Sequence, residues 1–90
     1  MAVYAYESLT ISSAASGLTA ATVDYASSAT ITVEGAAVRL RMDGSDPTAT
    51  EGHEAEPGDV ILLESSDELQ RARFIRRDGA NATLRISYFI

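Results

Sequence analysis

The sequence contains no cysteine and only one histidine. Without cysteine the chain has neither disulfides nor thiolate metal ligands, and its redox compartment leaves no signal. A transition-metal site built from imidazole ligands needs several histidines, and a Ser-His-Asp triad needs geometry that residue identities alone do not supply. Glycine-rich phosphate-binding loops are also absent. We therefore expect a non-enzymatic protein with no catalytic residues, no metal and no cofactor.

Long hydrophobic runs and lysine are missing as well. No apolar segment approaches the roughly 20 residues of a membrane-spanning helix, so we expect no membrane partner. The first ten residues lack the basic region and continuous apolar segment of a secretory signal. All seven basic residues are arginines, and the formal net charge is −6. Because sequence-independent nucleic-acid binding depends on cationic contacts to phosphate, we expect no nucleic-acid partner either.

What the chain does have is short alternating segments separated by turn signals. Its 90 residues correspond to one domain, residues 1–90. The pattern predicts an all-β fold, a single small antiparallel β-sandwich or barrel of about six to eight short strands. The segments expected to form strands are Val3–Ile11, Ala29–Glu34, Val38–Met42, Val60–Leu63, Leu69–Ile75 and Ala82–Ile90.

Several finer expectations follow from the same pattern. Residues 1–10 form either part of the first strand or an extended N-terminal arm. Residues 35–37 and residues 76–81 are predicted to be hairpin turns. Val60–Leu63 is apolar on both faces, which favours a central position in a sheet. Residues 65–68 are predicted to form a turn.

Residues 18–28 show no sustained period. We interpret them as a loop or short strand, with a short helix as the alternative. Their larger apolar side chains are expected to point toward the core; these are Leu18, Val23 and Tyr25.

A strand that runs into a dense turn cluster, residues 38–52, is the most distinctive stretch. Asp43-Gly44 supplies a tight turn, and Pro47 restricts Asp46 to extended backbone. Asp43, Ser45 and Asp46 could belong to a calcium loop, but the alternating acids, central glycine and closing glutamate of an EF-hand are absent. Turn-capping side chains are the alternative interpretation.

Charge is segregated along the chain. From Asp43 to Glu68 there are nine acidic residues and no arginine, and four arginines then follow within seven residues. The arginines either lie on a solvated face in ordinary cross-strand pairs or form a protein interface, where bidentate and stacking contacts favour this residue. The candidate interface residues are Arg39, Arg41, Arg71, Arg73, Arg76 and Arg77, together with Tyr4 and Tyr6 near the N-terminus.

The single histidine stands among acids. His53, Glu54 and Glu56 could form a weak ion site, and the following Pro57-Gly58-Asp59 faintly resembles a cupin turn. A loop histidine among solvated acids is the alternative interpretation.

The stretch VRLRMDGSDPTATEGH resembles a pattern found in small proteins and domains of tailed bacteriophages. There, a strand with an Arg-x-Arg pair enters a D-G-x-x-P-T turn that is soon followed by Gly-His. A P-G-D turn, an apolar strand, an arginine- and phenylalanine-containing strand (here RARFIRR) and a terminal strand (here LRISYFI) come next. The order of these features covers residues 29–90.

The resemblance implies a virion structural module. The expected role is that of a capsid decoration (cement) protein on the capsid exterior, bound to the major capsid protein and assembled as a homo-oligomer, with a trimer favoured. The alternatives are a neck, tail or head-fibre component, or a carbohydrate-binding module, which the low aromatic content supports poorly.

Overall fold

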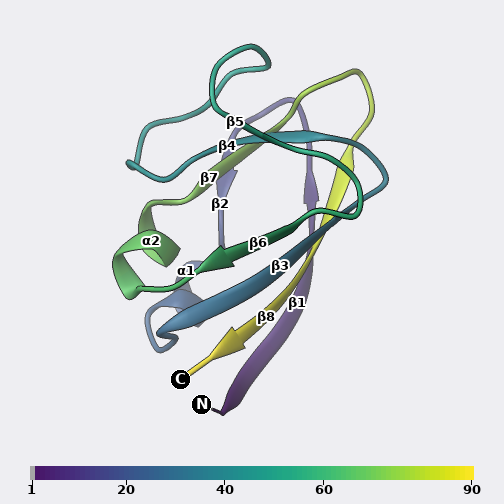
Figure 1. Ribbon diagram of the computed structural model, residues 1–90. Helices are drawn as coiled ribbons and strands as arrows, with labels where there is room; N and C mark the ends of the chain where they lie inside the picture. Colours follow the sequence, from purple (N-terminus) through teal and green to yellow (C-terminus); the bar gives the residue numbers. More distant parts are fainter. Residues whose placement is uncertain (1) are drawn as a thin grey trace.

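The computed structural model describes residues 2–90, which form eight strands and two short helices. The strands are β1 (Val3–Ile11), β2 (Ser16–Gly17), β3 (Ser28–Glu34), β4 (Val38–Arg41), β5 (His53–Ala55), β6 (Val60–Leu63), β7 (Arg73–Arg76) and β8 (Ala82–Phe89). The helices are α1 (Ala20–Val23) and α2 (Ser66–Arg71). They lie side by side along one side of the molecule (Figure 1).

The strands are arranged as a long antiparallel hairpin rolled into two layers. β1 pairs with β8, β2 with β7, β3 with β6 and β4 with β5. The pairs β3–β8 and β4–β7 join these into two four-stranded sheets, sheet A in the order β1-β8-β3-β6 and sheet B in the order β2-β7-β4-β5. This strand order is that of a jelly roll. The predicted all-β class, the sandwich and the strand number are confirmed.

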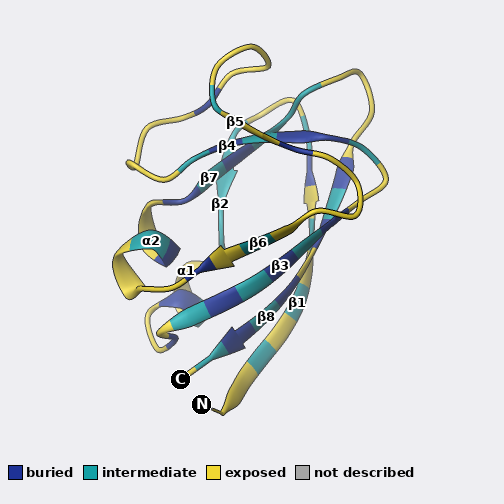
Figure 2. Cartoon of the chain, in the orientation of Figure 1, coloured by how far each residue is buried: buried dark blue, intermediate teal, exposed yellow. Residues whose placement is uncertain are grey.

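The core lies between the two sheets, as the buried strands in Figure 2 show. Inward rows of sheet A, with Ile31 and Val33 on β3 and Leu84, Ile86 and Tyr88 on β8, are fully or almost fully buried. Sheet B contributes Val38, Leu40 and Phe74, and the helices contribute Val23 and Leu69. Among the described residues no polar or charged residue is buried, so the interior is filled by apolar packing.

Glu7 occupies the inward row of β1 and is only half-buried. Its carboxylate accepts hydrogen bonds from the Tyr88 hydroxyl at 2.5 Å and from the Thr19 hydroxyl at 2.7 Å. These bonds satisfy the acid and tie β1 to β8 and to the start of α1. Residues 3–10 therefore lie within sheet A, and the interpretation of this segment as an extended arm is wrong for the described residues.

Both predicted hairpins are wrong. β3 and β4 belong to different sheets, as do β7 and β8, so residues 35–37 and 77–81 are crossings between layers. Each of these four strands buries one apolar row against the opposite sheet. Alternation predicts that buried row, but it does not show whether two strands that follow each other in the chain are also hydrogen-bonded neighbours. Gly79 does not adopt the positive φ that a type I′ hairpin turn requires.

The position of residues 60–63 also differs from the prediction. β6 is an edge strand of sheet A, and Val60 and Leu62 are each 57% exposed. Only Leu63 is fully buried, and Ile61 is partly buried against the core. Apolar character on both faces therefore marks an exposed apolar edge here, and not a central strand.

The chain from 65 to 76 folds as a helix followed by a strand. The turn predicted for residues 65–68 is wrong, because Ser66–Arg71 forms helix α2. The strand predicted for Leu69–Ile75 begins later and is β7, Arg73–Arg76. The Ser65 hydroxyl accepts from the Glu68 amide at 3.2 Å, and the Glu68 carboxylate accepts from the Glu64 amide at 3.1 Å. These bonds cap the first turn of α2.

The other departures are smaller. Helix α1 lies within residues 18–28, so the alternative of a short helix is confirmed there, and Val23 is buried as expected. Tyr25 is 73% exposed, so its predicted inward orientation is wrong. His53–Ala55 forms the short strand β5, which is not among the expected strands.

Candidate interaction site: an arginine-anchored corner

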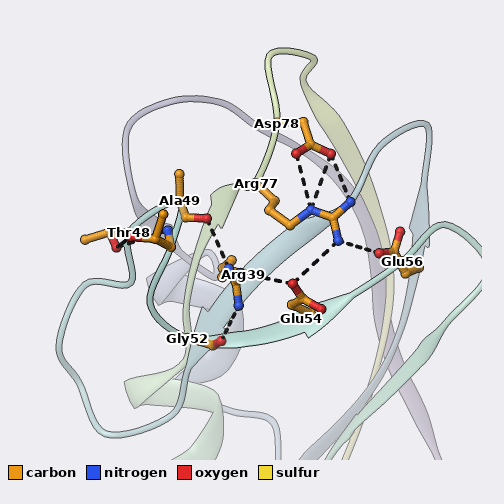
Figure 3. Close-up of polar contacts among 9 residues, drawn as sticks. Arg39, Thr48, Ala49, Gly52, Glu54, Glu56, Arg77 and Asp78 are labelled. Atoms are coloured by element: carbon orange, nitrogen blue, oxygen red, sulfur yellow. Dashed lines mark hydrogen bonds and ion pairs between the residues drawn. The ribbon is translucent and has the colours of Figure 1, made fainter.

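The loop between β4 and β5, residues 42–52, is held by an arginine of β4. The Arg39 side chain donates to the carbonyl oxygens of Ala49 at 3.1 Å and Gly52 at 3.0 Å. It also forms an ion pair with Glu54, its cross-strand neighbour on β5, at 3.0 Å (Figure 3). Because one planar guanidinium reaches all three groups, it fixes the loop relative to both strands.

A second arginine extends this cluster across the surface. Arg77 pairs with Asp78 at 3.0 Å and with Glu56, and it lies 3.7 Å from Glu54 (Figure 3). The hydrogen bonds from Arg77 hold the pKa of the Asp78 carboxyl below its usual value, and those to Asp78 and Glu56 raise the pKa of Arg77. Since Glu54 touches both guanidiniums, Arg39, Glu54, Arg77, Glu56 and Asp78 form one charge network.

Two further arginines secure the Asp43–Pro47 turn. Arg41 makes a bidentate contact to Asp43, with N–O distances of 3.1 and 2.6 Å, and Arg73 contacts Asp46 at 2.8 Å. Arg41 and Arg73 stand opposite each other on β4 and β7, where like charges repel unless compensated. The two aspartates supply that compensation, and the contact with Arg41 lowers the pKa of Asp43.

The turn residues are also fixed by packing. Pro47 is buried, and Gly52 has a φ of +137°. A Cβ at Gly52 would lie 3.0 Å from the Leu40 carbonyl oxygen and 3.2 Å from the Pro47 side chain. The Asp43 carboxylate accepts from the Ser45 amide at 3.2 Å, which is the turn-capping role considered from the sequence. The motif D-G-x-x-P-T…G-H, residues 43–53, thus specifies a corner between β4 and β5 that is held by these contacts.

The predicted interface arginines are therefore spread over sheet B, its loops and helix α2. Arg39, Arg41, Arg73 and Arg77 gather around the corner, and the Arg71 carbonyl accepts from the Gly44 amide at 3.2 Å. The side chain of Arg71 pairs with Asp67 one helical turn away, and Arg76 donates to Asn81 at 2.8 Å. All six cationic side chains thus have acceptors within the chain, and three of the four arginines at 71–77 pair with carboxylates of the acidic segment.

An open hollow borders the corner. It has a volume of about 510 Å³ and is lined by Arg41, Glu51, Gly52 and His53. Glu54 and Glu56, the carboxylates considered as partners of His53 in an ion site, are engaged by Arg39 and Arg77. Residues 2–90 contain no cluster of three or more potential metal ligands.

The predicted tyrosines lie on the other sheet. Tyr4 and Tyr6 are 40% and 60% exposed on β1, and Tyr6 faces outward in the same cross-strand row as Ser87, Thr30 and Leu62. Sequence reasoning missed Val60 and Leu62 as surface residues, because their unbroken apolar run is typical of a buried strand. The structure thus offers two distinct surfaces, the charged corner on sheet B and the outer face of sheet A with its exposed apolar residues.

Among the described residues no helix is both long and apolar enough to cross a membrane. No protein-family model, curated protein or solved structure matches the chain.

Proposed function

We propose that the protein is a non-enzymatic structural component of a bacteriophage virion. In this proposal it decorates the capsid exterior and binds the lattice of the major capsid protein. The observation that carries the proposal is the D-G-x-x-P-T…G-H motif, which is similar to that of small phage proteins. Three residues of the motif have a structural task here: Asp43 binds Arg41, Pro47 is buried, and the Gly52 carbonyl accepts from Arg39.

The distribution of polar groups supports a structural role. The space between the sheets is filled, and the described residues contain no buried polar or charged residue. The ionic side chains around the corner pair with one another and order a loop that would otherwise be free to move. A jelly roll is used by viral capsid domains, but also by lectins and cupins, so the fold alone does not select the function.

The mechanism follows from linkage. A protein that binds the assembled lattice and not its disrupted form stabilises the lattice by mass action. Association of copies, with the trimer favoured, adds avidity because several lattice subunits are engaged at once. Hence we expect capsids that carry the protein to resist heat better than bare capsids.

The test is the copy number of the chain in purified virions, measured by quantitative mass spectrometry against the major capsid protein. Hundreds of copies are expected for a decoration protein. A dozen or fewer would support the alternative, a neck, tail or head-fibre component. Absence from the particle would refute the virion proposal.

A further inference from the structure

The two sheets protect their edges very differently. Sheet B ends in β2 and β5, which have only two and three residues, and β5 carries His53 and Glu54. Short edges and charged side chains are the devices by which monomeric proteins prevent strand addition. Sheet A ends in β1, with nine residues, and β6, with four. Neither strand contains proline or a basic residue, and the one acid of β1, Glu7, points inward.

Large apolar side chains are exposed at both edges of sheet A. Val3 is 70% and Tyr6 is 60% exposed on β1, and Val60 and Leu62 are 57% exposed on β6. The strands between them present hydroxyl groups outward, including Thr30 and Thr32 of β3 and Ser87 of β8. The outer face of sheet A therefore has two apolar margins and a polar centre, in which hydroxyl groups surround one ion pair, Arg85–Glu34.

The charge on this face is balanced. Its ionic residues, Arg85 and Glu34, pair with each other at 2.9 Å. The formal charge of −6 is consequently carried by the remainder of the molecule. Two copies of an acidic protein repel each other over most of their surfaces, but they meet no such repulsion at this face.

We infer that the chain self-associates head to tail, with the β6 edge of one copy against the β1 edge of the next. A two-fold contact through one edge would cover that edge and leave the other exposed. A head-to-tail contact uses both edges of every copy and forms a closed ring if the rotation between copies closes. The occupant of each apolar edge is then a second copy of this chain. This inference does not depend on the proposed function.

Sedimentation equilibrium of the purified protein provides the first test. The wild-type chain is expected at a multiple of its 9.5 kDa mass. The double substitution Val60→Lys with Leu62→Lys places cations on the β6 edge and is expected to give the monomer mass with an unchanged circular dichroism spectrum. The matched control is Tyr25→Lys, at a residue 73% exposed outside the sheets, and it should leave the assembly intact.

Two outcomes would overturn the inference. One is a wild-type protein that sediments as a monomer at every concentration. This outcome includes the case in which copies associate only when they are bound to a capsid. The other is an assembly that the β6 substitutions do not disturb.

Cross-linking tests the head-to-tail geometry, because the chain has no native cysteine. With a short bis-maleimide, Tyr6→Cys and Leu62→Cys as separate single variants should yield little product. Mixing the two variants should give dimers, and the double variant should give cross-linked products larger than a dimer. Efficient dimers from either single variant would indicate a two-fold contact and refute the head-to-tail arrangement.

Discussion

At the scale of single residues, the corner depends most on Gly52. Gly52 combines a left-handed backbone with a close approach to Leu40 and Pro47. Its carbonyl also accepts from Arg39, so a shift of this residue would disturb the hydrogen bond as well as the packing. Gly58, in the turn before β6, has a φ of +94°, but a Cβ added there would meet no atom within 4 Å. A comparison of substitutions at these two glycines therefore separates the effect of steric crowding from that of backbone strain.

We predict that Gly52→Ala destabilises the protein more than Gly58→Ala does. Positive φ alone costs a side chain about 1–2 kcal/mol, which is the expected loss for Gly58→Ala. Gly52→Ala must in addition displace the Leu40 carbonyl or Pro47, so a total loss of about 2–4 kcal/mol is expected. Urea unfolding followed by circular dichroism measures both values. Equal losses would show that crowding at residue 52 is relieved without cost.

At the scale of elements, the arginines of β4 and β7 connect strands to loops. Arg39 reaches across β5 and the preceding loop, and Arg41 and Arg73 hold the two aspartates of the turn. Surface ion pairs contribute little on average, but Arg39 is largely covered and donates to two backbone carbonyls. Its role in ordering the loop should therefore exceed that of an isolated surface pair.

We predict that Arg39→Met loosens residues 48–54 and lowers the free energy of unfolding by about 1–3 kcal/mol, the usual cost of losing hydrogen bonds to a charged group. Hydrogen exchange should rise in this segment more than in the sheets. The control is Arg71→Met, which removes an exposed pair within α2 and should cost less than about 0.5 kcal/mol. Unchanged exchange in residues 48–54 would contradict the anchoring role of Arg39.

At the scale of the whole molecule, the jelly roll places Tyr88 in the core next to Glu7. Burial, with a further contribution from the hydrogen bond to Glu7, raises the pKa of the Tyr88 phenol. In the unfolded chain a tyrosine ionises near pH 10. The folded state therefore holds this proton more tightly, and the resulting stability is fully present below about pH 10 and is lost as the pH rises further. The chain has no lysine or cysteine, and it has three tyrosines besides Tyr88.

We predict that Tyr88→Phe flattens the decline of stability above pH 10. At neutral pH the variant should be about 1–2 kcal/mol less stable, because the bond to Glu7 is lost. Unfolding free energies measured from pH 7 to 11 test both effects, with Tyr25→Phe as the exposed control. A Tyr88→Phe protein with the wild-type alkaline decline would refute the assignment.

The sequence by itself determined the class of the fold and the existence of a defined corner at residues 43–47. These features are local, because alternation sets which face a side chain takes and turn residues set the backbone at one point. The helix α2 was also within reach, since Ser65 and Glu68 have the spacing of a capping box, but the apolar alternation that follows favoured a strand.

Only the tertiary structure decided which strands are neighbours. Backbone hydrogen bonds between strands are almost independent of sequence, so alternation cannot tell a hairpin from a crossing between sheets or a central strand from an edge. For the same reason the sequence showed an acidic segment and an arginine segment but not their pairing. The rolled arrangement brings Arg39, Arg73 and Arg77 onto the acids of another segment, and it leaves the apolar β6 at an open edge.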